Sequence, residues 1–261
     1  MQRLNSQISG KGAPLVLVHG LGSASSVWKP IRSILNQSFE VITVDLPGHG
    51  KTPYQNGQPM DPHSLGQYVF DELTQLGFEE FHLVGNSLGG WVALEMASSH
   101  SERVKSLTAL APAGLWLNPY NARYPGTALA RFLARNTSKF APTALHFEAA
   151  RRIGFSEVSP RWRDLSYETC LDAALAMASA EGYFPAWDGM LMKRFDGKIP
   201  HTLPVTIIFG DSDRTLPATT CQERSLAPSH AKWIVFPNTG HAPMWDAPLD
   251  VADEIRKNAK L

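Results

Sequence analysis

The fold of this 261-residue chain is decided by Gly85-Asn86-Ser87-Leu88-Gly89, a stretch of the form G-x-S-x-G. Residues 81–84 before it are apolar and typical of a buried strand, and residues 88–97 after it are rich in good helix formers. A serine on the sharp turn between a strand and a helix is lifted above the sheet, and side chains at the flanking glycines would collide with backbone. The stretch therefore predicts a nucleophilic serine at Ser87, and not a serine that only caps the next helix.

Strands and helices alternate on both sides of this turn. Further strands are predicted at residues 14–18, 40–44, 107–110, 205–209 and 233–236, and further helices at 26–35, 65–76, 217–226 and 248–259. Because parallel strands need crossover connections, the alternation predicts an α/β fold with a mostly parallel sheet and helices on both faces. Ligands of such sheets bind beyond the carboxyl ends of the strands, which is where Ser87 is expected.

The alternation stops between residues 113 and 198, where the sequence becomes helical and rich in aromatic residues. We predict that this segment is a helical cap, inserted into a core formed by residues 1–112 and 199–261. Aromatic side chains over a sheet edge favour an apolar binding pocket. A cap of this length is also expected to gate access to the pocket.

Composition excludes several classes of partner. The chain has 24 basic and 24 acidic side chains and a net charge of zero, so it lacks the excess of positive charge that binding to nucleic acid requires. No apolar stretch is long enough to cross a bilayer, and the N-terminus lacks the apolar run of a signal peptide, so we expect a cytoplasmic protein without a membrane partner. Cys170 and Cys221 do not have the close spacing in sequence that is typical of metal ligands. We therefore expect neither a bound metal nor another cofactor.

A serine hydroxyl becomes a good nucleophile only when a base removes its proton and a third group orients that base. His241 follows the strand at 233–236 on a loop with Gly240, and it is the candidate base. Asp211 and Asp213 both follow the strand at 205–209, and spacing alone does not separate these two candidate acids. Serine, acid and histidine thus occur in the order expected of such a triad.

Two backbone N–H groups are candidates for stabilising an oxyanion. The N–H of Leu88 follows the serine at a helix N-terminus, and the N-H of Leu21 lies in the glycine-rich turn after the strand at 14–18. Trp28 follows that turn, while Met244 and Trp245 follow the histidine. These three side chains are the candidates for lining a substrate pocket.

Five motifs in chain order resemble the α/β-hydrolase superfamily: residues 19–22, 45–50, 85–89, 210–217 and 240–243. The resemblance implies the α/β-hydrolase fold, with Asp213 as the acid, His241 as the base, and Leu21 and Leu88 as oxyanion donors. The short N-terminus leaves room for one of the two strands that usually precede the strand at 14–18. A serine at position 87 excludes the branches that use an aspartate nucleophile.

Within the serine branch, the chain is similar both to cofactor-free haloperoxidases, which are in essence esterases, and to carbon-carbon bond hydrolases. The leading expectation is a carboxylesterase that cleaves small to medium-sized carboxylic esters through an acyl-enzyme on Ser87. One alternative is a carbon-carbon hydrolase of the meta-cleavage type, which would use the same triad and a cap arginine to bind a substrate carboxylate. Another alternative is a non-catalytic ligand receptor on the same fold.

Overall fold

A mostly parallel sheet of seven strands forms the centre of the computed structural model, which describes residues 2–260. The strands are β1 (Ser6–Gly10), β2 (Ala13–Val18), β3 (Phe39–Val44), β4 (Phe81–Asn86), β5 (Val104–Leu110), β6 (Val205–Gly210) and β7 (Lys232–Phe236). Their order is β1-β3-β2-β4-β5-β6-β7, and only the β1–β3 pair is antiparallel. The predicted sheet is confirmed, and within the described residues β1 is the one strand that precedes β2.

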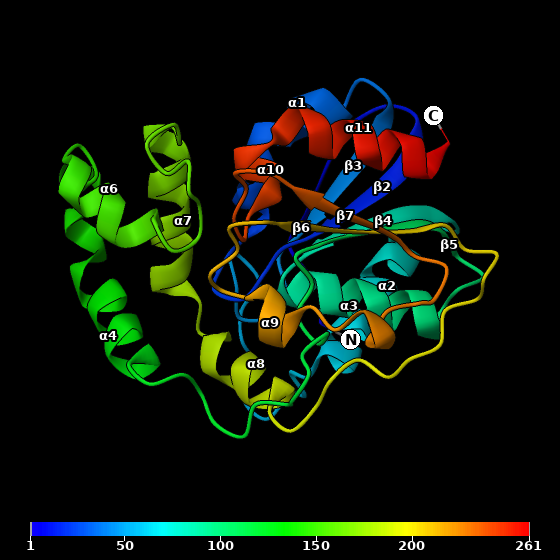
Figure 1. Cartoon of the computed structure of the whole chain (residues 1–261), viewed down its shortest axis with the longest axis horizontal. Coiled ribbons are helices and arrows are strands. Elements are labelled where there is room, and N and C mark those ends of the chain that lie inside the picture. The colour runs from blue at the N-terminus through cyan, green and yellow to red at the C-terminus, as the bar shows by residue number, and fades with distance from the viewer. Residues whose placement is uncertain (1, 261) are drawn as a thin grey trace.

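Helices cover both faces of this sheet, as the alternation predicts (Figure 1). One face carries the 3₁₀ turn η1 (Ser25–Trp28) and the helices α1 (Lys29–Leu35), α10 (Pro243–Asp246) and α11 (Pro248–Ala259); the other carries α2 (Pro62–Gln75) and α3 (Leu88–Ser99). Successive strand side chains point to opposite faces, so that Leu17 packs in the α1/α11 layer and Val16 in the α2/α3 layer. Burial on both faces explains why the strands are continuous apolar runs.

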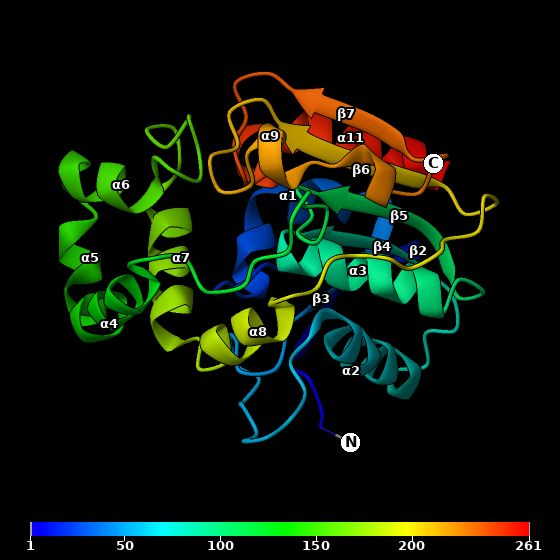
Figure 2. The same cartoon turned by 60° about the horizontal axis from the view of Figure 1, so that its bottom comes forward.

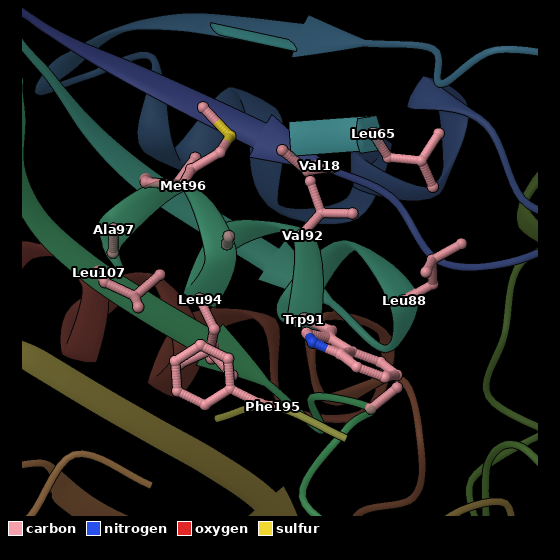
Figure 3. Packing of buried hydrophobic residues seen from close by; sticks show 14 of the residues in the cluster. Val18, Leu65, Leu88, Trp91, Val92, Leu94, Met96, Ala97, Leu107 and Phe195 are labelled. Atoms are coloured by element: carbon pink, nitrogen blue, oxygen red, sulfur yellow. The ribbon is translucent and has the colours of Figure 1, made fainter. Parts of the chain in front are cut away.

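The helix after the G-x-S-x-G turn is the most deeply buried of these helices. Figure 3 shows its residue Val92 close to Val18 of β2 and Leu65 of α2, while Leu94 lies toward Phe195. Trp91 is fully buried and meets Trp116 edge-on at 5.1 Å between ring centroids. Because residues 88–94 of α3 are all buried, the turn at its N-terminus has a fixed position above the sheet.

The segment between β5 and β6 forms helices that lie beyond the carboxyl ends of the parallel strands (Figure 2). They are α4 (Thr127–Thr137), the turn η2 (Ser138–Phe140), α5 (Ala141–Ala144), α6 (Glu148–Phe155), α7 (Tyr167–Ser179) and α8 (Tyr183–Met190). A small apolar cluster of its own, including Leu145, Phe155 and Trp162, holds this cap together. None of the helices described in residues 2–260 is long and apolar enough to span a membrane.

The structure divides the helix expected over residues 26–35 into η1 and α1, and it corrects the helix expected over residues 217–226. The segment contains only α9 (Ala218–Cys221) and the 3₁₀ turn η3 (Arg224–Leu226). The side chain of Glu223 accepts a hydrogen bond from the Ser225 N–H at 3.0 Å, which starts a new turn and competes with a continuous helix.

Candidate active site

Ser87 lies on a strained turn between β4 and α3. Its backbone φ of 57° and ψ of −120° fall in a region that residues other than glycine rarely adopt. A Cβ atom at Gly85 would lie 2.0 Å from the carbonyl oxygen of Gly89, and one at Gly89 would lie 2.2 Å from that of Val18. The two glycines of the motif are therefore required by the close approach of three backbone segments.

An unbroken chain of hydrogen bonds connects Ser87, His241 and Asp213. The distance is 2.9 Å between Ser87 Oγ and His241 Nε2, and again 2.9 Å between His241 Nδ1 and Asp213 Oδ2. In the tautomer that carries its proton on Nδ1, this N–H donates a hydrogen bond to the Asp213 carboxylate. The lone pair of Nε2 is then free to accept the serine proton. The other carboxylate oxygen of Asp213 accepts hydrogen bonds from the backbone N–H groups of Thr215 and Leu216, so the acid itself is fixed in place.

Asp211, the other candidate acid, lies outside this chain of contacts. Its carboxylate is bonded to the hydroxyl of Ser212 and the N–H of Thr239, and the Ser212 hydroxyl is the main cause that lowers its pKa. The structure thus brings Asp213, and not Asp211, to the histidine.

The two proposed oxyanion donors lie beside the serine. Gly20 is so close that a Cβ atom there would lie 3.0 Å from the Cβ of Ser87, which places the following residue, Leu21, at the nucleophile. Leu21 and Leu88 both line the cavity above Ser87. Within residues 2–260, neither of their N–H groups donates to another protein group, so both are free to bind a ligand oxygen.

Two side chains that the sequence analysis did not single out hold the backbone around the histidine. The amide of Asn86 donates to the carbonyl oxygen of His241 at 3.0 Å, and the carboxylate of Asp246 accepts the N–H of Gly240 at 2.8 Å. Burial raises the pKa of Asp246, against the opposing effect of its hydrogen bonds to Ser159 and Gly240. A carboxylate inside the otherwise apolar run 242–248 is the sequence signal that could have identified Asp246.

A cavity of about 570 Å³ extends from Ser87 into the cap. Its wall includes the aromatic side chains of Trp116, Tyr120 and Trp187, together with small cap residues such as Ala134, Ala144, Ala173 and Gly154. Trp245 lines this cavity, as expected of a pocket residue. The expectation is wrong for Trp28 and Met244, because both are fully buried in the core layer beside α1 and α11 and do not line it.

Apart from the histidine, no ionisable cation or carboxylate from residues 2–260 lines the cavity. None of the cap arginines lines it, and two of them have other partners: Arg131 binds the carbonyl oxygens of Met177 and Ala180, and Arg123 binds Asp188. Nor does the described part of the chain bring three His, Cys, Asp or Glu side chains together in a way that could hold a metal ion.

Comparison with known proteins places the whole chain among hydrolases. Residues 15–254 match the model of the family described as the alpha/beta hydrolase family. The chain is 30% identical over 251 residues to a pimeloyl-[acyl-carrier protein] methyl ester esterase of Aeromonas hydrophila subsp. hydrophila, covering 94% of this chain and 95% of that protein.

Solved structures of esterases have the same fold. One is a thermophilic esterase from Thermogutta terrifontis, with a TM-score of 0.73 and 22% identity, covering 97% of this chain and 92% of the other. Another is an esterase from Rhodococcus sp. ECU1013, with a TM-score of 0.75 and 18% identity, covering 98% and 94%.

Proposed function

The chain belongs to the alpha/beta hydrolase family, and we propose that it hydrolyses small to medium-sized carboxylic esters through an acyl-enzyme on Ser87. The observation that carries this proposal is the continuous contact from Asp213 through His241 to Ser87. The serine lines a cavity that Leu21 and Leu88 also line, and the N–H groups of these two residues have no partner among residues 2–260. Nucleophile, base, orienting acid and oxyanion donors are thus all within reach of one bound ester.

The arrangement supports a two-step acyl transfer. Ser87 Oγ attacks the ester carbonyl carbon while His241 Nε2 takes the serine proton, and the N–H groups of Leu21 and Leu88 stabilise the oxyanion. The imidazolium then gives its proton to the leaving alcohol oxygen as the carbon–oxygen bond breaks. A water molecule attacks the acyl-enzyme with His241 again as base, which releases the carboxylic acid and restores the serine. Every step uses groups of the chain itself and requires no metal or cofactor.

The nature of the cavity supports an uncharged ester as the substrate. Its walls are apolar and aromatic, and no described charged side chain is present to offset the desolvation of an ionised substrate. The similarity to a methyl ester esterase points to the same class of bond. A carbon-carbon hydrolase would need a cation for its substrate carboxylate, and the cap arginines lie elsewhere, so this alternative is less favoured.

The proposal is tested by steady-state hydrolysis of chromogenic esters, from acetate to decanoate, with the wild type and Ser87→Ala side by side. We expect turnover by the wild type, with an optimum at one chain length, and loss of nearly all of it in the variant. Asp213→Asn should reduce kcat far more than its matched control, Asp211→Asn. Negligible turnover of every ester by the wild type would contradict the proposal and favour the carbon-carbon hydrolase or the receptor.

A further inference from the structure

Among residues 2–260, Asp213 is the one hydrogen-bond partner of His241 Nδ1, so the position of the imidazole ring also depends on the backbone of the histidine. That backbone is held by the cap. The N–H of His241 donates to the carbonyl oxygen of Val158 at 2.8 Å, and Val158 belongs to the cap segment between α6 and α7. The core supplies the opposite contact, from Asn86 to the His241 carbonyl.

Asp246 connects the same cap segment to the residue before the histidine. One carboxylate oxygen accepts the N–H of Gly240 at 2.8 Å, and the other accepts the hydroxyl of Ser159. Arg161 donates to the backbone carbonyl oxygen of Asp246. Ser159 and Asp246 are 0% and 1% exposed, so these bonds are shielded from competing water.

The backbones of the two segments are also in close contact. A Cβ atom at Gly240 would lie 2.2 Å from the carbonyl oxygen of Val158 and 2.9 Å from the ring of Pro160. Only glycine allows this approach, and any outward shift of the cap segment would remove the Val158 contact from the histidine. The position of the cap and the position of the imidazole are therefore coupled through the chain backbone.

We propose that Asp246 and the cap segment 158–161 form a histidine clamp, which positions His241 for catalysis and makes ring placement depend on a closed cap. The inference rests on the proposed function of Ser87 and His241 and adds positioning residues to it. Asp246 and Ser159 touch neither the serine nor the cavity, and they act through the backbone of residues 240–241. An apolar pair of similar volume would fill the space without burying a carboxyl group, so cohesion of the cap alone does not require this polar link.

The clamp is tested with Asp246→Ala, Ser159→Ala and Asp246→Asn, and with Ser156→Ala as a matched control in the same part of the cap. Ser156 has no side-chain hydrogen bond to lose within the described residues, whereas Ser159 does. Asparagine retains an oxygen that can accept the Gly240 N–H and an amide that can donate to Ser159 Oγ. Activity is measured on an acetate and a hexanoate ester, below the melting temperature of each variant.

We expect Asp246→Ala to lower kcat roughly ten- to a hundredfold on both esters, because a misplacement of about 1 Å can cost that much, with KM changed less than about threefold. Ser159→Ala should lower kcat in the same direction, and the double variant should be no slower than Asp246→Ala, because both changes break one link. Asp246→Asn should recover activity to within about threefold of the wild type, and Ser156→Ala should match the wild type. The rate of fluorophosphonate labelling of Ser87 should fall with kcat.

Unchanged kcat in folded Asp246→Ala or Ser159→Ala would overturn the clamp, as would a loss seen only in KM for the longer ester. The test still decides if Asp246→Ala does not fold. Ser159→Ala removes only one hydroxyl group, so it breaks the same link with a smaller change to the structure. Failure of the clamp is distinguishable from failure of the proposed function. If only the clamp fails, Ser87→Ala still abolishes the ester hydrolysis that the wild type shows. If the proposed function fails, Ser87→Ala does not abolish it.

Discussion

Asn86 directly precedes the nucleophile in the chain, and its amide donates to the carbonyl oxygens of both His241 and Leu110, at 3.0 and 3.1 Å. We predict that Asn86→Ala lowers kcat roughly tenfold, because the carbonyl group of His241 loses the donor that Asn86 supplies and the histidine loop can shift, whereas the Leu110 carbonyl keeps the Ser87 N–H. Asn258→Ala is the matched control, since Asn258 also donates to a β5 carbonyl, that of Leu107, but from the distant helix α11. Steady-state kinetics of both variants decide the matter, and equal kcat values would contradict a role for Asn86 at the histidine.

The lowered pKa of the buried His49 imidazole is expected to make the stability of the fold depend on pH. Burial, followed by repulsion from the neighbouring His19, lowers its pKa from 6.5 to about 3. The folded protein keeps this imidazole neutral, whereas the unfolded chain takes up a proton once the pH falls below 6.5, so stability is lost as the pH decreases toward the folded value. Between pH 7 and pH 5 this group should cost about 2 kcal/mol of unfolding free energy.

Urea unfolding of the wild type and of His49→Asn at the two pH values measures this contribution. The side-chain amide of asparagine can still donate to the carbonyl oxygen of Pro47, as the imidazole does. The wild type should lose more stability than the variant on acidification. A loss of the same size in both would mean that His49 titrates alike in the folded and unfolded states.

The sequence predicts the functional residues that belong to a recognisable motif. It does not predict the residues whose partners are brought close only by the folded chain. Ser87, His241 and the two candidate acids follow strand ends in recognisable patterns. Asn86 and Asp246 act on backbone groups, and the partner of Asn86 lies 155 positions away in the chain. The position of Trp28 next to the oxyanion turn suggests a pocket residue and does not reveal that its side chain packs in the α1/α11 layer.

The turn between β4 and α3 can be tested as an element. Gly89→Ala would place a Cβ atom 2.2 Å from the Val18 carbonyl oxygen, so strand β2 or helix α3 would have to move. We predict a loss of roughly 1–3 kcal/mol in unfolding free energy, as for other overpacked sites, together with a loss of activity. Denaturant unfolding measures the first effect and ester hydrolysis the second.

Gly154→Ala in α6 is the control for that experiment. A Cβ atom at Gly154 meets no other atom within 4 Å, and alanine is the better helix former. The variant should be more stable than the wild type by up to about 1 kcal/mol. Equal effects of the two substitutions would show that the tight approach at Gly89 carries no energetic weight.

The remaining elements differ in how far the sequence predicts them. Strands buried on both faces form continuous apolar runs between turn residues, and for this reason their positions are predicted closely. The segment 217–226 has helical spacing of its apolar residues but also the local side-chain contact of Glu223, which periodicity does not reveal. Local hydrogen bonds there prevail over a weak propensity.

At the scale of the whole molecule, the cavity between core and cap should set the length of the substrate. Gly154 lines the cap part of this cavity, and the space beside it is free. We predict that Gly154→Leu lowers kcat/KM for the longer esters by roughly tenfold and leaves acetate within about twofold, because the new side chain occupies chain-binding space. Ala149→Leu, exposed on the same helix and outside the cavity, is the matched control.

The ester series used for the wild type measures this shift. A change of equal size for acetate and for the longest ester would indicate that α6 affects catalysis and not chain binding, and so would contradict the prediction. The presence of a helical, aromatic segment at 113–198 is evident from the sequence. Its cavity is not, because the inner faces of α4, α5 and α7 become visible only when the helices are packed together.

The central claim is that the acyl group of the ester is transferred to Ser87, and it is tested most directly by trapping the acyl-enzyme. The wild type is mixed with a chromogenic hexanoate ester, quenched in acid during turnover, digested and analysed by mass spectrometry. We predict a hexanoyl group on the peptide that contains Ser87, and no such group in Ser87→Ala. Turnover by the wild type with the acyl group on another residue, or with no acylated peptide and no initial burst of product, would contradict the account.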